Sequence, residues 1–343
     1  MRMTAMTTMR AMKATWPAWA GRAALVWSAG YAAGAVVAAL CPGFAFGYAA
    51  GGKWRGTTAE WTLAAAYALA ALLAYAMLRR PASRWPPAAA WGVALLALMS
   101  GFGFLFSPAH VLDLVSRNQP PMDWAAWANS GAATLGALLW GCAALAHRRH
   151  RRGVCGHCGG RGRRAVVERR TRAGYLAVAA LVPYTALKTA WALGAHVGYH
   201  GHKQRPGMDE YYAGDALIWL YDHGVDTTAV LALIGMLLAL ALTLPWGRRL
   251  PRWPLLGLGW TGAGALAPFG VYLLVYGSLV WAGVVDGGTA IDGWVVTVAY
   301  GGFSAYGLAL GAATRAYQQA TRRSCAHCPG GTARTDVLSS TAT

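Results

Sequence analysis

The chain has 343 residues, of which 56% are hydrophobic and only 12% are charged, and its formal net charge is +18. This composition is too apolar for an ordinary soluble domain and points to an integral membrane protein. The positive charge lies in segments between apolar stretches, so we expect contact with membrane lipids and no binding of nucleic acid.

Eight apolar stretches come close to the roughly 20 residues that a helix needs to cross a bilayer. In chain order they are 23–40, 61–78, 87–105, 124–146, 173–195, 228–246, 255–275 and 294–313. The segment 1–22 is expected to be cytoplasmic. The first stretch reads as a retained helix and not a cleaved lipoprotein signal, because Leu40 and not a small residue precedes Cys41.

Basic residues are concentrated in every second loop between the apolar stretches, and acidic residues are concentrated in the loops between those. With both termini inside, the cytoplasmic segments hold 24 of the 30 Lys and Arg residues, and the external loops hold ten of the twelve acids. The abundance of Ala, Gly and Arg is typical of a GC-rich genome. We therefore predict a multipass protein of the bacterial inner (cytoplasmic) membrane, with both termini in the cytoplasm.

Sequence elements recur at an offset near 170 residues: Arg84-Trp85-Pro86 returns as Arg252-Trp253-Pro254, and Trp124 returns as Trp294. Because each half contains four predicted helices, both halves begin on the same side of the membrane, and the two repeats are therefore parallel. The predicted fold is an all-α bundle of eight transmembrane helices, built as two four-helix repeats at 23–150 and 173–320. The remaining segments are a basic loop at 151–172, an enlarged external loop at 195–227 and a cytoplasmic tail at 321–343.

Two C-x2-C motifs follow the fourth and the eighth predicted helices, Cys155 with Cys158 and Cys325 with Cys328. Four thiolates in two such knuckles are the ligands of a structural tetrahedral zinc site. Such a site would clasp the two halves together at the cytoplasmic face. Two alternatives stay open: redox or sensing chemistry, although no thioredoxin-like unit surrounds either motif, and two pairs that share no site.

Lys188 is an ionisable residue inside the fifth apolar stretch, in the run VPYTALKTAWALG. A charged group at this depth costs several kcal/mol unless it is paired or hydrated, so Lys188 is a candidate intramembrane functional site. Asp215 and Asp222 are conceivable partners. The alternative is that the long side chain snorkels to the interface. Pro183, one turn earlier, is expected to interrupt helical hydrogen bonding.

The enlarged external loop holds four histidines, His196, His200, His202 and His223, which are candidates for an external metal site. Their spacing matches no defined ligand motif, and solvated loop histidines are the alternative. The stretch 209–221 has the pattern of a short amphipathic helix with aromatic residues at head-group depth.

Three functions remain open: a transporter or channel for a small solute, a membrane enzyme or cofactor-handling protein, and a non-catalytic assembly, anchoring or redox- or metal-sensing protein. The four-plus-four layout is similar to that of haem A synthases, but the nine histidines lie in loops or near helix ends, so neither haem nor a nucleotide is expected. Enzymatic activity of a soluble type is not expected. The basic cytoplasmic face could receive a protein partner.

The Trp-, Ala- and Gly-rich helices, such as YTALKTAWALG, and the basic C-x2-C tails resemble multipass inner-membrane proteins of GC-rich bacteria. This resemblance covers the whole chain and implies no particular activity. The sequence therefore favours a transporter-like or channel-like membrane protein with a cytoplasmic zinc clasp.

Overall fold

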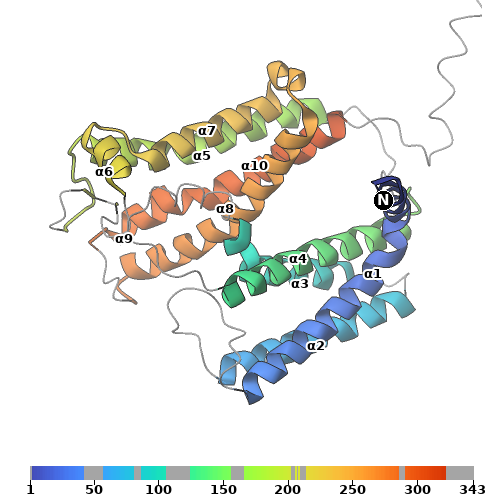
Figure 1. Ribbon diagram of the computed structural model, residues 1–343. Coiled ribbons are helices and arrows are strands. Elements are labelled where there is room, and N and C mark those ends of the chain that lie inside the picture. Colours follow the sequence, from blue (N-terminus) through green and yellow to red (C-terminus); the bar gives the residue numbers. More distant parts are fainter. Residues whose placement is uncertain are drawn as a thin grey trace, which may run out of the picture. The chain divides into compact units, whose positions relative to one another are not determined.

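The protein is mainly helical in the part of the chain that the computed structural model describes, which comprises residues 2–41, 57–80, 86–105, 124–155, 166–201, 205–206, 208, 214–285 and 290–321 (Figure 1). Within these ranges the only β-type backbone pairing is one isolated antiparallel bridge between Tyr199 and Ile291. The helices fall into two compact units, the first containing α1 to α4 and the second α5 to α10.

In the first unit the helices are α1 (Arg2–Leu40), α2 (Thr57–Arg79), α3 (Pro86–Leu105) and α4 (Trp124–Arg151). The first helix thus begins well before residue 23, and most of the segment 1–22, predicted to be a separate cytoplasmic segment, is part of α1. Helix α1 packs on α2 and on α4. The core between them holds Tyr31, Tyr67 and Trp140. The Trp140 indole donates to Ser28 Oγ at 3.0 Å, and the Tyr31 hydroxyl donates to Asn129 Oδ1 at 2.5 Å.

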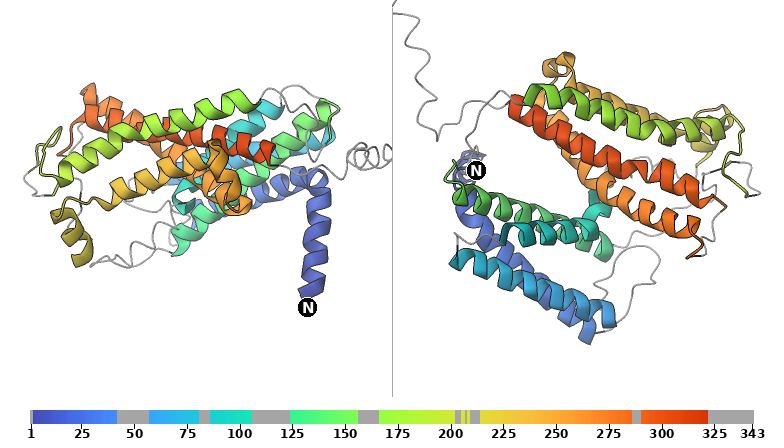
Figure 2. Two further views of the ribbon diagram at one scale, coloured as in Figure 1. Left: turned by 90° about the horizontal axis from the view of Figure 1, so that it is seen from above. Right: turned by 180° about the vertical axis from the view of Figure 1, so that it is seen from behind.

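In the second unit the helices are α5 (Val166–Ala192), α6 (Asp215–Asp222), α7 (Thr227–Thr243), α8 (Arg252–Trp281), α9 (Gly293–Val295) and α10 (Gly302–Ala320). A 3₁₀ turn, η2 (Pro245–Arg249), follows α7, and a π-helical segment, η3 (Val296–Tyr300), joins α9 to α10. Helix α10 lies along both α8 and α5, and α5 lies along α7 (Figures 1 and 2).

Small residues let α8 and α10 approach closely. A methyl group on Gly270 would collide with the backbone of Ser304, and one on Gly307 would collide with the backbone of Ala267. Gly311 faces Ala263 in the same seam. The Gly307-x3-Gly311 spacing thus serves close packing of these two helices. A related contact occurs inside the first unit, where a methyl group on Gly101 would collide with the backbone of Thr134.

Five helical segments are long and apolar enough to cross a membrane, namely Trp16–Leu40, Glu60–Arg79, Trp127–Arg151, Arg252–Trp281 and Gly293–Ala320. The pair α6 and α7, bent by 80°, could supply a sixth. The eight predicted stretches are largely helical, but 173–195 and 228–246 extend past the ends of α5 and α7, and α3 offers only the shorter apolar segment Ala88–Gly101. Helix α5, which contains Lys188, is not among the apolar segments of spanning length. The protein is a multipass helical membrane protein with five or six candidate spans among the described residues.

Candidate functional site

Lys188 is one member of a buried ion pair. It sits near the end of α5, its Nζ is 3.1 Å from Asp226 Oδ2, and the two side chains are 4% and 5% exposed. The Lys188 ammonium is thus paired within the protein and is not exposed at its surface. The partner is therefore Asp226, at the end of the enlarged loop 195–227, and not Asp215 or Asp222. Removal of both charges from water requires this close pairing.

Asp226 has a second role as the N-cap of α7. Its Oδ1 accepts hydrogen bonds from the backbone N–H of Thr228 at 2.7 Å and of Ala229 at 3.2 Å, and from the Thr228 hydroxyl at 2.5 Å. The first N–H groups of a helix lack partners within the helix and carry a partial positive charge, so an anionic cap stabilises them. One carboxylate therefore joins Lys188 on α5 to the first turn of α7.

Aromatic side chains surround the pair. Lys188 Nζ lies 5.6 Å from the centre of the Trp191 ring, which is almost fully buried and whose indole N–H donates to the carbonyl of Val197 at 2.9 Å. One turn earlier on α5, Tyr184 is also buried, and its ring centre is 5.3 Å from that of Tyr300 in η3. These rings keep water from the charges, which strengthens their mutual attraction.

The site lies beside an elbow in the chain. Helices α6 and α7 meet at 80°, and Gly224, Val225 and Asp226 occupy the bend. Gly224 has φ of +79°, a left-handed conformation that favours glycine. Discontinuous helices of this kind are also found at the solute sites of membrane transporters.

Helix α6 is held against the preceding loop. Tyr221 is buried and its hydroxyl donates to the carbonyl of Pro206 at 2.9 Å. The Arg205 guanidinium donates to both oxygens of Asp222, at 2.6 Å each, and these hydrogen bonds hold the pKa of the exposed Asp222 carboxyl below its usual range. Trp219, 59% exposed, stacks on His223. The predicted amphipathic helix is thus present, beginning at Asp215.

The histidines proposed as an external metal site are not brought together where the structure describes them. His196 Nδ1 lies 3.1 Å from the carbonyl of Gly194, His200 Nε2 lies 2.9 Å from Asp292 Oδ1, and His223 Nδ1 lies 2.7 Å from the carbonyl of Trp219. His202 lies outside the described residues. Among the described residues no three His, Cys, Asp or Glu side chains are grouped to hold a metal ion.

The cysteine motifs fall mostly outside the described residues. Cys155 is described, in the short non-helical stretch that follows α4, and is half-buried without a disulfide bond. Cys158, Cys325 and Cys328 lie outside the described ranges, so the geometry of the four thiols is not described. The zinc clasp rests on the spacing of the motifs.

Comparison with protein-family models, with curated proteins and with solved structures finds no match. The sequence did contain a signal for the residue that was missed: Asp226 stands directly before Thr227-Thr228 and an apolar run, which is the pattern of a helix N-cap.

Proposed function

We propose that this membrane protein is a transporter-like or channel-like protein for a small solute, and that Lys188 and Asp226 form the charged element of its solute site. The observation that carries the proposal is the ion pair itself, with both side chains at most 5% exposed and 3.1 Å apart between apolar helices. Ionisable groups inside membrane proteins typically mark solute or proton pathways.

Stability alone does not require this pair. Two charges removed from water recover at best about what their desolvation costs, and well-packed apolar residues of similar volume often stabilise a protein as well or better. The pair also stands where regular helix geometry ends, beside the α6–α7 elbow and the π-helical η3. Irregular backbone of this kind recurs at functional sites, because it frees polar groups and lets helices move.

The proposed architecture is a duplicated four-helix unit, eight spans in all. Two contacts support it: Gly101 against Thr134 in the first unit and Gly270 against Ser304 in the second, which lie 169 and 170 residues further along the chain. Between the first helices of the two halves the offset falls to 153 residues, at which Tyr31 matches Tyr184, and both of these tyrosines are buried. At the position matching Lys188 the first half has buried Ala35, so the charge pair belongs to the second half.

The orientation and the metal are further parts of this proposal. With both termini in the cytoplasm, as the distribution of Lys and Arg favours, the Lys188–Asp226 pair lies near the external face. On the opposite face, Cys155, Cys158, Cys325 and Cys328 would hold a structural zinc ion, for which the two C-x2-C spacings are the support.

A structural role is the second candidate, and one observation favours it. Lys188 Nζ and both carboxylate oxygens of Asp226 have close partners, so the pair can serve as a brace between α5 and α7. A membrane assembly, anchoring or redox- or metal-sensing protein would use such a brace without transporting anything.

Transport by purified protein in liposomes separates the two functions. Radiolabelled glycine, acetate and glycerol serve as zwitterionic, anionic and neutral probes, and saturable uptake of at least one charged probe above that of protein-free liposomes is expected. The double variant Lys188→Met with Asp226→Asn removes both charges and keeps a helix-capping side chain, so it should abolish uptake while remaining folded. Uptake unchanged in this variant, or no uptake of any probe by the wild type, would favour the structural role.

A further inference from the structure

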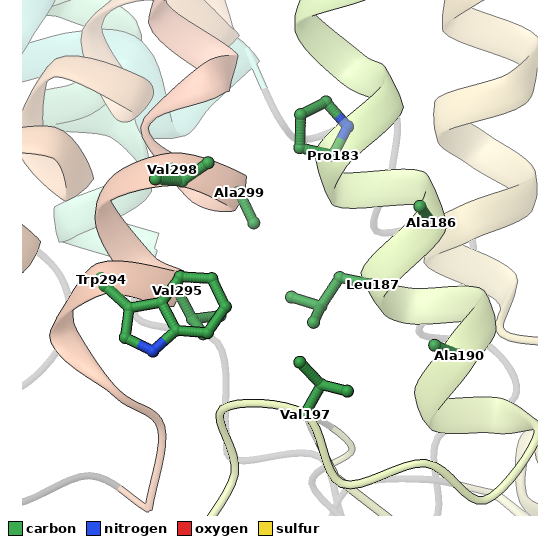
Figure 3. A pocket seen from close by; sticks show the side chains of 9 residues that line it. All are labelled: Pro183, Ala186, Leu187, Ala190, Val197, Trp294, Val295, Val298 and Ala299. Carbon is green, nitrogen blue, oxygen red and sulfur yellow. The ribbon is translucent and has the colours of Figure 1, made fainter.

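A crevice of about 300 Å³ opens between α5 and the segment formed by α9 and η3 (Figure 3). One wall is the face of α5 that carries Ala186, Leu187 and Ala190 below Pro183. The facing wall carries Trp294, Val295, Val298 and Ala299, and Val197 closes one end. These lining residues all belong to the second unit.

The crevice exists because two helices depart from regular geometry at the same level. Pro183 has no N–H to donate within α5. Across from it, the π-helical turn of η3 widens the helix and changes which side chains face α5. Ala186 and Ala190 add little volume on the α5 side. The two helices therefore do not close on each other here as α8 and α10 do along their glycine seam.

The chemistry of the walls excludes a polar occupant. No charged residue lines the crevice, and the only polar side-chain atom among the lining residues is the indole nitrogen of Trp294, which donates to Asp292 Oδ2 at 3.1 Å. A polar or ionic solute would lose its hydration without gaining partners. The Lys188–Asp226 pair is directed toward α7, so the crevice is distinct from the proposed solute site.

The crevice is continuous with exposed apolar surface. Val298 is 49% exposed and Trp294 is 40% exposed, and both belong to the candidate span Gly293–Ala320. Val182, beside the crevice on α5, is 50% exposed. In a bilayer these side chains would contact hydrocarbon. Trp294, whose indole N–H donates to Asp292, lies at the end of the crevice that is nearer to polar groups. An alkyl chain can therefore enter sideways without crossing a polar barrier.

We infer that the crevice between α5 and η3 is a binding site for one acyl chain of a bilayer lipid. The chain lies against Ala186 and Ala190 on one side and against Val298 and Ala299 on the other, with the polar end of the lipid toward Trp294. Burial of methylene groups against these side chains and improved packing of an otherwise open crevice drive the binding. This inference does not depend on the proposed transport function.

Photolabelling of the full-length protein tests the site. The protein is reconstituted in phosphatidylcholine bilayers that contain a small fraction of phosphatidylcholine with a diazirine in one acyl chain, and labelled residues are mapped by mass spectrometry of peptides. We expect labelling of Val298 and Ala299 to exceed several-fold that of Leu231 and Leu233, which are 42% and 49% exposed on α7. Equal labelling at all four positions would identify annular lipid only and would overturn the inference.

A matched pair of variants gives a second readout. Ala186→Trp fills the crevice and should reduce labelling of Val298 and Ala299 to the level of Leu231, whereas Val182→Trp places the same bulk on exposed surface and should leave it unchanged. Labelling of Leu231 and Leu233 reports whether the variant protein is still folded in the bilayer. Undiminished labelling of Val298 and Ala299 in a folded Ala186→Trp protein would also overturn the inference.

Discussion

Asp226 holds Lys188 and the first turn of α7 at the same time: Oδ2 lies 3.1 Å from Lys188 Nζ, and Oδ1 lies 2.7 Å from the backbone nitrogen of Thr228. The positive end of one helix and a buried ammonium group thus share one carboxylate. The Asp226 carboxylate therefore links Lys188 on α5 to the first turn of α7.

Removal of one charge of the pair should cost more than removal of both. Lys188→Met leaves a buried carboxylate and Asp226→Asn leaves a buried ammonium, and each should lower the free energy of unfolding by about 3–5 kcal/mol. The double variant should recover most of this loss. Unfolding of detergent-purified protein by heat or by SDS gives the comparison.

The control is Arg205→Ala, which removes an ion pair whose Asp222 side chain is 44% exposed. A partly exposed pair contributes about 1 kcal/mol, so this variant should lose much less stability than either single variant of the buried pair. Additive losses in the Lys188 and Asp226 double variant would contradict direct pairing of the two charges.

The capping role of Asp226 can be measured separately from its charge. Asn accepts the hydrogen bonds of a helix N-cap nearly as well as Asp, whereas Ala does not, so Asp226→Ala should unfold more readily than Asp226→Asn by about 1 kcal/mol. Both variants lose the negative charge equally. The difference between their unfolding curves therefore reports the cap, and identical curves would exclude it.

The glycine seam between α8 and α10 should reject larger side chains at defined positions. Gly270→Val should cost more than about 1–3 kcal/mol, because the added atoms meet the backbone of Ser304, which cannot move aside as a side chain can. Gly257→Val on the same helix is the control, since nothing lies within 4 Å of an added methyl there. Yield and monodispersity in size-exclusion chromatography provide the measurement, and equal behaviour of both variants would contradict the seam.

The zinc clasp predicts about one zinc ion per chain in detergent-purified protein. A variant with Cys155→Ser and Cys325→Ser removes one thiolate from each motif, so it should lose the metal and melt at a lower temperature. Elemental analysis and a thermal melt provide both readouts. Metal-free wild-type protein with the thiols of all four motif cysteines titratable would exclude the clasp and favour redox sensing.

The proposed orientation predicts opposite labelling of two exposed positions in a Cys41→Ser background. A membrane-impermeant maleimide should label His196→Cys in intact cells, whereas Arg248→Cys should react only after the membrane is opened. Both side chains are exposed, so accessibility within the fold does not distinguish them. Labelling of Arg248→Cys in intact cells would reverse the assigned orientation.

The amino-acid sequence by itself determined the class of the protein. Hydropathy is a local property, and the eight apolar stretches are largely helical, although only five segments, or six with the bent pair, have the length and apolarity of a span among the described residues. Lys188 could be singled out for the same reason, because one charge in a long apolar run is visible in the sequence alone.

Only the tertiary structure decided what Lys188 does. Its partner depends on how α5 packs on α7. The N-cap pattern marks Asp226 as the start of α7, but it does not show that this carboxylate, and not that of Asp215 or Asp222, reaches Lys188. The crevice beside Pro183 likewise requires the π-helical turn of η3 on the opposite helix, which hydrophobic periodicity does not predict. Both features arise where side chains far apart in the sequence meet, and the physical reason is that pairing and packing depend on distances in space that the order of residues does not specify.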